Sequence, residues 1–378
     1  MKKLIRIGSL AVSAALLIAG CGAPPEAAAP EVIVEPTETI TAPAEGGETA
    51  HETVTPVEGL LPCIAAQGDG GFEDRSFNQS AMEGLTQATT ELGITDFRQT
   101  VSPDESALVD HLEEFVAQGC TLIVATGFQF APALAQVAEA HPDVHFLMVD
   151  ADIQPPLPNV KTVLFNTAEA SFLAGYVAAA YSSREGGANH VGTFGGAQIP
   201  TVTDFMNGFR QGVEYYNETN GTDVRVTGME SFTGGFAQGP EATAIAQGLV
   251  DQGVDVILPV GGAIFLSAVT VIEGADRPIA LIGVDQDIFY SEPTTQDMVL
   301  TSILKHVNVA VHDAVKMSAT GAWDNTPYFG NLENGGVGIA PFHNFEAQIP
   351  ADVQANIARL SQDIAAGTVH VQSDVAPN

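Results

Sequence analysis

Short apolar runs alternate with longer amphipathic runs along the chain from Leu60 onward. The apolar runs predict strands at Leu61–Ala66, Phe97–Val101, Thr121–Ala125, His145–Val149, Val160–Phe165, His190–Phe194, Asp223–Met229, Asp255–Val260, Ile279–Val284 and Val299–Ile303. The amphipathic runs predict helices, for instance at Ser80–Leu92, Asp104–Gln118, Ala168–Tyr181, Thr201–Tyr216, Pro240–Gln252 and Val307–Met317. This alternation predicts an α/β fold with parallel sheets, in which ligands gather beyond the carboxyl ends of the strands.

The pattern has two similar halves. One begins at Leu60 and the other near Asn189, and each opens with a strand followed by a glycine pair, Gly70-Gly71 or Gly195-Gly196. The repeated units span about 320 residues, which is more than a single hydrophobic core usually serves. We therefore expect two Rossmann-like lobes with a ligand cleft between them.

The first residues have the charge order of a secretory signal. Lys2, Lys3 and Arg6 precede a short apolar run that ends in Leu-Ile-Ala-Gly-Cys at Cys21. This ending matches a lipobox, so we expect residues 1–20 to be a lipoprotein signal peptide and Cys21 to carry a lipid anchor; an ordinary signal peptide that is cut elsewhere is the alternative. Residues 21–57 are rich in Ala, Pro, Glu and Thr and contain no Phe, Tyr or Trp, which predicts a disordered tether.

The net charge of the chain limits the kinds of partner that it can bind. Lys and Arg number 13 against 46 Asp and Glu, which gives a formal net charge of −33. So acidic a surface repels nucleic acid, and the few cationic side chains cannot build a polyphosphate site. We therefore expect a small-molecule ligand and no nucleic acid partner.

Two cysteines remain besides Cys21. Cys63 lies in the first predicted strand and Cys120 just precedes another. If those strands are neighbours, a disulfide is geometrically possible in an exported protein, and two buried free thiols are the alternative.

Motifs of common enzyme classes are absent from the sequence. It contains no Gly-x-Ser-x-Gly elbow, no phosphate loop ending in Gly-Lys-Ser/Thr, no His-Glu-x-x-His and no Cys-x-x-Cys. His141 and His145 are four residues apart, but Pro142 and Asp143 between them argue against a helical metal-binding pair. We expect no catalytic residues, no metal and no cofactor.

A glycine-rich stretch from Gly68 to Gln79 separates the first predicted strand from the first helix. Its glycines permit a sharp turn, and Ser76 or Asn78 can cap the helix while its free N–H groups face outward. Phe77 stands between these polar residues, and its ring suits stacking on a flat ligand with polar edges. The stretch therefore predicts a ligand-binding loop.

Aspartates close two of the predicted strands, Asp150 in the first half and Asp285 in the second. A carboxylate at this position points into the crevice of a parallel sheet, where it can accept two hydrogen bonds from a ribose diol or from ring N–H groups. A helix cap or a turn is the alternative for each aspartate. Because each half supplies one, we favour the cleft.

Glycines and aromatic residues follow other predicted strands. Gly127-Phe128 and Gly261-Gly262 let the backbone approach a ligand on the cleft wall. Phe128 could instead pack under its turn, and Phe232 and Phe236 are further aromatic candidates that we rank below Phe77.

Gly70 to Gln79 resembles the signature of the basic membrane protein family, which is a glycine pair, an acidic pair, a basic residue and Ser-Phe-Asn-Gln. The strand ends at Asp150 and Asp285 and the Leu-Thr-Ser-x-x-Lys run at Lys305 also resemble that family. Its members are substrate-binding lipoproteins of ABC importers and include purine-nucleoside receptors. The resemblance implies the type I periplasmic-binding-protein fold. Together with the residue patterns above, it predicts a ligand site made of Asp69, Ser76, Phe77, Asn78, Gly127, Phe128, Asp150, Gly262, Asp285 and Lys305.

The resemblance also sets expectations for individual positions. Lys305 would donate hydrogen bonds to the sugar, with a salt bridge to Asp285 as the structural alternative. The family usually has an aspartate where Gly68 stands, so that Asp69 is displaced by one residue, and its nucleoside receptors have a second stacking aromatic residue where Leu258 lies.

In this fold the chain crosses between the lobes three times. We expect crossings at Asn166, within Asp285 to Pro293 and within Gly321 to Gly330. One lobe would then contain residues 58–165 and about 288–320, and the other would contain residues 166–287 and about 321–378.

The expected function is that of an extracytoplasmic, lipid-anchored monomer that captures a small polar ligand and passes it to an ABC permease. A purine nucleoside is the leading ligand. One rival is a sensor of the same fold for a sugar, a vitamin or a signal molecule. The other is a hydrolase, in which Asp69 and Asp74 near Asp150 could hold Ca²⁺.

Overall fold

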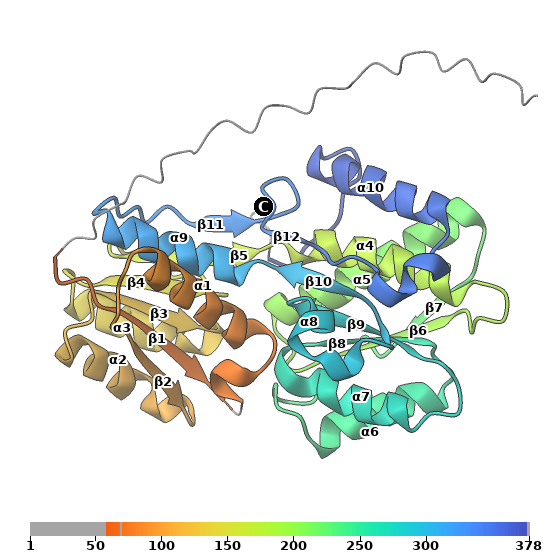
Figure 1. Cartoon of the computed structure of the whole chain (residues 1–378), viewed down its shortest axis with the longest axis horizontal. Coiled ribbons are helices and arrows are strands. Elements are labelled where there is room, and N and C mark those ends of the chain that lie inside the picture. Colours follow the sequence, from red (N-terminus) through yellow and green to blue (C-terminus); the bar gives the residue numbers. More distant parts are fainter. Residues whose placement is uncertain (1–57, 69, 376–378) are drawn as a thin grey trace, which may run out of the picture. The chain divides into compact units, whose positions relative to one another are not determined.

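The computed structural model describes residues 58–68 and 70–375 (Figure 1). In this part of the chain the strands form two six-stranded sheets, with the orders β11-β5-β4-β3-β1-β2 and β12-β10-β9-β8-β6-β7. The first sheet contains β1 (Pro62–Gln67), β2 (Arg98–Ser102), β3 (Leu122–Thr126), β4 (His145–Val149), β5 (Val160–Phe165) and β11 (Tyr328–Gly330). The second contains β6 (His190–Gly195), β7 (Arg225–Thr227), β8 (Val256–Val260), β9 (Ala280–Asp285), β10 (Val299–Lys305) and β12 (Val337–Ile339).

Helices connect most consecutive strands and cover the sheets (Figure 1), whereas loops join β4 to β5 and β11 to β12. They are α1 (Phe77–Glu91), α2 (Leu108–Ala117), α3 (Ala131–Ala140), α4 (Thr167–Ser182), α5 (Pro200–Asn220), α6 (Pro240–Asp251), α7 (Phe265–Glu273), α8 (Ile288–Ser291), α9 (Val307–Ala319) and α10 (Ala351–Ala365). Except for β12, which runs antiparallel to β10, the paired strands are parallel. The predicted α/β architecture with two parallel-sheet lobes is confirmed.

The chain passes between the two sheets at three places. It leaves the first sheet after Phe165, leaves the second after Lys305, and passes once more between β11 and β12. The prediction for the second crossing, within Asp285 to Pro293, was wrong, because β10 pairs with β9 and so belongs to the second lobe. β11 likewise pairs with β5 and belongs to the first lobe, which moves the third crossing past Gly330.

Each crossing helix packs on the first helix of the lobe that it enters. α4 packs on α5, and α9 packs on α1. Glycines make the first contact close: a methyl group at Gly175, Gly208 or Gly212 would collide with backbone atoms of the other helix. The helix α4 is buried on nearly all sides, inside a hydrophobic cluster that includes residues of both lobes. The crossing side of the molecule is therefore tightly packed.

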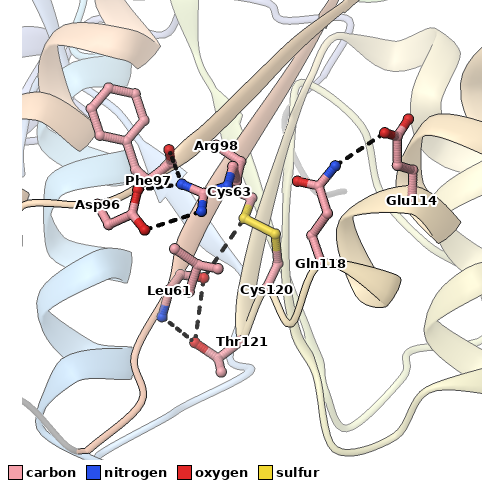
Figure 2. The surroundings of a disulfide bond; sticks show 9 residues. All are labelled: Leu61, Cys63, Asp96, Phe97, Arg98, Glu114, Gln118, Cys120 and Thr121. Carbon is pink, nitrogen blue, oxygen red and sulfur yellow. Dashed lines mark hydrogen bonds and ion pairs between the residues drawn. A yellow bond between two sulfur atoms is a disulfide. The ribbon is translucent and has the colours of Figure 1, made fainter.

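A disulfide joins Cys63 in β1 to Cys120, which precedes β3 (Figure 2). β1 and β3 are neighbours, and the two Cα atoms lie 6.0 Å apart. Of the two alternatives for these cysteines, the structure has the disulfide.

The predicted signal peptide (residues 1–20), the lipidation site Cys21 and the predicted tether (residues 21–57) lie outside the described residues. Within the described part, no helix combines the length and the apolar character that a membrane crossing requires.

Candidate ligand-binding cleft

A cavity of about 570 Å³ lies between the carboxyl ends of the two sheets. Its lining includes eight of the residues that the sequence predicted: Phe77, Asn78, Gly127, Phe128, Asp150, Gly262, Asp285 and Lys305. A volume of this size is typical of small-molecule sites, which measure roughly 300–1,000 Å³. The two other predicted residues differ: Ser76 is buried behind the cavity wall, and Asp69 lies outside the described residues.

The loop before α1 is held by Asp74, which is buried. Its carboxylate accepts hydrogen bonds from the backbone N–H groups of Ser76, Asn78 and Gln79 at 2.9–3.0 Å. Ser76 occupies the N-cap position, as predicted, but its side chain makes no capping hydrogen bond; the carboxylate of Asp74, two residues earlier, takes that role. Burial raises the pKa of Asp74, against the lowering effect of the three N–H groups.

The two strand-end aspartates share an unusual backbone conformation. Asp150 and Asp285 both have φ of 68°, in the left-handed region that residues other than glycine rarely adopt. Such conformations persist only where the surrounding structure holds them in place, and they cluster at functional sites. Both side chains are mostly buried and both line the cavity.

Lys305 forms an ion pair with Asp150 from the opposite lobe. The lysine is 3% exposed, so both charges are largely removed from water. The alternative of a salt bridge to Asp285 was wrong; the ammonium meets the aspartate of the other sheet instead. Among the residues that the structure describes, Oδ1 of Asp150 has no hydrogen-bond partner, although it is buried.

Asp285 accepts a hydrogen bond from Oγ of Ser76, again across the lobes. Burial raises the pKa of this carboxyl to about 6, while the positive charge of Lys305 and the Ser76 hydroxyl act to lower it. The carboxylate is therefore largely ionised at pH 7 and protonated in mild acid.

Aromatic rings line the cavity from both lobes. Phe77 and Phe128 belong to the first lobe, and Phe205 and Phe236 to the second. Nζ of Lys305 lies 4.9 Å from the ring centroid of Phe77 and 5.8 Å from that of Phe205. Leu258 is fully buried in the core and does not line the cavity.

Phe236 was ranked low from the sequence, and Phe205 was not among the predicted site residues. Phe236 packs against three glycines, Gly196, Gly261 and Gly262, and a Cβ atom at any of them would collide with it. Two glycine pairs at strand ends were the available signal, because they leave space for a ring. The sequence contained no sign of a role for Phe205, because its position is that of an ordinary core residue of an amphipathic helix.

Glycines also shape the first lobe's side of the cavity. Gly68 and Gly127 have φ of 96° and 106°, and both line the cavity. A Cβ atom added at Gly68 would meet nothing within 4 Å, so the missing family aspartate leaves open space at this position. Beside Gly127, the buried Oε1 of Gln129 has no hydrogen-bond partner in the described part of the chain.

The two sheets, the crossing segments and the cavity between lobes define the class of two-lobed solute-binding proteins. Residues 62–374 match the model of the Bmp family, described as ABC transporter substrate-binding protein PnrA-like. The chain belongs to this family, as the resemblance of the loop and strand ends indicated.

Relatives and solved structures agree with this membership. The chain is 26% identical, over 392 aligned residues, to the ABC transporter nucleoside-binding protein BmpA of Lactococcus lactis, an alignment that covers 98% of this chain and 99% of that protein. It is 27% identical to basic membrane protein A1 of Borrelia garinii over 316 residues, or 82% and 87% of the two chains. A solute-binding protein of an ABC transporter system from Aeropyrum pernix superposes with a TM-score of 0.75 at 25% identity, covering 83% and 93%.

The protein is thus a substrate-binding protein of an ABC transporter, with a small-molecule ligand and a permease as its partners. Its family and fold are those of solute-binding proteins rather than enzymes. Within the described residues, no group of three or more His, Cys, Asp and Glu side chains is placed to hold a metal ion.

Proposed function

We propose that the protein binds a nucleoside in this cleft, with purine nucleosides as the preferred ligands, and delivers it to the permease of an ABC importer. One observation carries the proposal: a single cavity joins aromatic rings from opposite lobes to strand-end carboxylates from opposite lobes. The rings of Phe77 and Phe236 offer flat apolar surfaces to a nucleobase. Asp150 and Asp285 offer acceptors to the hydroxyl groups of a ribose.

The unpartnered oxygen of Asp150 supports a ligand that donates hydrogen bonds. Its Oδ2 is bound by Lys305, so the carboxylate is held in place, while Oδ1 lacks a partner among the described residues. Buried acceptors are nearly always satisfied in folded proteins, and leaving one unsatisfied costs about 1–3 kcal/mol. A ribose hydroxyl would supply the missing donor.

The charges around the cavity favour a ligand without phosphate. Its lining includes the carboxylates of Asp74, Glu105, Asp150, Glu241 and Asp285. Against these stands one ammonium in the described lining, Lys305, which is already paired with Asp150. A phosphate group would therefore be repelled, and nucleotides should bind more weakly than nucleosides.

The name of the Lactococcus lactis relative, a nucleoside-binding protein, supports the same ligand class. We further propose that Cys21 anchors the protein by lipid to the outer face of the membrane, because the lipobox pattern precedes it. A monomer suffices for capture, since one chain supplies both walls of the cavity.

Titration calorimetry on protein freed of co-purified ligand tests the proposal. Adenosine, guanosine, inosine, cytidine and uridine are compared with adenine, ribose and adenosine monophosphate. Purine nucleosides should bind more tightly than the base, the sugar or the monophosphate. The proposal is wrong if every nucleoside is silent. Tryptophan fluorescence is a poor substitute, because Trp323 stacks on His145 at the far end of β4 from Asp150.

A further inference from the structure

A second contact joins the lobes outside the ligand cavity. Nη1 of Arg75 donates to Oε2 of Glu292 at 2.5 Å and to the carbonyl oxygen of Ser291 at 3.3 Å. In return, Oγ of Ser291 donates to the carbonyl oxygen of Arg75 at 3.1 Å. Arg75 lies in the loop before α1 of the first lobe, whereas Ser291 and Glu292 follow β9 of the second. None of the three residues lines the cavity.

The accepting carboxylate of Glu292 is held in place by its own lobe. The side chain of Glu292 is 11% exposed, and its other oxygen accepts from Oγ1 of Thr294 at 2.7 Å. Arg75 has φ of 59°, so the loop backbone adopts a left-handed conformation where the arginine reaches across. An ion pair with one fixed, mostly buried partner loses less side-chain entropy on forming than a pair of two mobile surface groups.

The outer contact and the ligand site share the same two chain segments. The residue after Arg75 is Ser76, which donates to Asp285. Asp285 ends β9, and the short helix α8 that follows it ends at Ser291. Asp285 lines the cavity. Docking Arg75 on Glu292 therefore brings together the segments that carry Phe77 and Asp285.

We propose that Arg75 and Glu292 are positioning residues for ligand capture, which stabilise the closed pair of lobes without touching the ligand. This inference rests on the proposed function, in that capture proceeds by closure of the lobes. Apparent affinity scales with the population of the binding-competent state, so loss of the contact raises the Kd of every ligand by the same factor. A side chain that touched the ligand would change different ligands unequally.

Calorimetry with adenosine and guanosine tests the inference on Arg75→Gln, Glu292→Gln and the double variant. Each single variant should raise both Kd values by a common factor of about 3 to 10, and the double variant should raise them no further. Arg98→Gln is the matched control: Arg98 is 39% exposed against 43% for Arg75, pairs with Asp96 inside the first lobe, and should leave both Kd values unchanged. Unchanged affinity in both single variants, or a factor that differs between the two ligands, would overturn the inference. Unfolding midpoints near the wild-type value exclude simple misfolding.

A second measurement separates this inference from the proposed function. If the wild type binds no nucleoside, the proposed function fails, but closure can still be followed in ligand-free protein. Spin labels at Glu139→Cys and Gln247→Cys, exposed positions on α3 and α6, report the distance between lobes in a Cys21→Ala chain. Arg75→Gln and Glu292→Gln should shift the distances to longer values. Identical distance distributions in wild type and both variants would overturn the inference whatever ligand binds.

Discussion

Each lobe has an aspartate at the carboxyl end of an equivalent strand, but the two aspartates have different hydrogen-bond and charge partners. Leu122 pairs with His145 in the first sheet, and Val256 pairs with Ala280 at the corresponding place in the second. Asp150 lies as far along the chain from His145 as Asp285 lies from Ala280, so the two aspartates are equivalent. Both have the same φ. Each carboxylate is bound by a residue from the opposite lobe, but Asp150 meets the ammonium of Lys305 while Asp285 meets the hydroxyl of Ser76.

The reason for this asymmetry lies one strand further along each sheet. By the same registers, the residue of the first lobe that corresponds to Lys305 is Phe165. The second lobe therefore extends the ammonium group of Lys305 across the cleft, whereas the equivalent residue of the first lobe is uncharged. A near-symmetric scaffold thus yields a site with two distinct ends, as a ligand with two distinct ends requires.

The lobes also differ at the base of their sheets. Cys63 and Cys120 form the disulfide of the first lobe (Figure 2), and their equivalents in the second lobe are Gly192 and Val254. There, the space above Gly192 is filled by Val254 and Leu249. In the first lobe a covalent bond joins β1 to the segment before β3. In the second lobe apolar packing joins the equivalent segments, β6 and the segment before β8.

Removing the cation is expected to have the largest effect. Lys305→Met leaves the buried carboxylate of Asp150 without its partner, which should cost about 3–5 kcal/mol in the free energy of unfolding and abolish nucleoside binding. Lys316→Met, at an exposed pair with Glu91, is the control and should change the unfolding free energy by less than about 1 kcal/mol. Urea unfolding and calorimetry measure both. Equal behaviour of the two variants would contradict the central role of the Lys305 pair.

Replacing the disulfide of the first lobe is expected to have the second-largest effect. Cys63→Ala with Cys120→Ala should lower the free energy of unfolding by about 2–5 kcal/mol and leave the nucleoside Kd unchanged. Cys63→Gly with Cys120→Val installs the packing pair of the second lobe and should recover about 1 kcal/mol of that loss. Urea unfolding compares the two. No recovery would show that the first lobe cannot use the packing that serves the second.

The two aromatic walls offer a direct comparison between lobes. Phe77→Leu and Phe236→Leu should each weaken nucleoside binding by about 1–3 kcal/mol, because each removes one stacking surface. Phe128→Leu should weaken binding less, because Phe128 is 37% exposed. Calorimetry measures all three. A loss confined to Phe77 would mean that the ligand is stacked on one side.

Acid should affect the second lobe's carboxylate. Because burial raises the pKa of Asp285 to about 6, and hydroxyl donors bind its ionised form, the nucleoside Kd should rise about tenfold per pH unit below pH 6 and stay flat above it. Asp285→Asn should bind weakly and without this pH dependence. Stability responds in the opposite sense: the folded pKa exceeds the ordinary 3.8, so this group's contribution falls as the pH rises from 3.8 to about 6. A pH-independent wild-type Kd between pH 5 and 7 would contradict a role for ionised Asp285.

The sequence predicted the local features of this molecule well. Apolar runs indicated the main strands, and strand-end residues such as Asp150, Asp285 and Gly127 indicated the cleft, because the carboxyl ends of parallel strands meet at one edge. What could not be read from the sequence depends on contacts between distant segments. The run that became β10 looks the same whichever sheet it joins, so the second crossing was misplaced. The reach of Lys305 to Asp150 depends on how the lobes face one another, and no local pattern encodes that.

A crystal structure of the protein with adenosine tests most directly whether the cleft binds a nucleoside between its two lobes. We expect the base to lie between the rings of Phe77 and Phe236, and ribose hydroxyls to donate hydrogen bonds to Oδ1 of Asp150 and to the carboxylate of Asp285. A nucleoside bound elsewhere, or one whose ribose leaves both carboxylates without contact, would contradict this expectation.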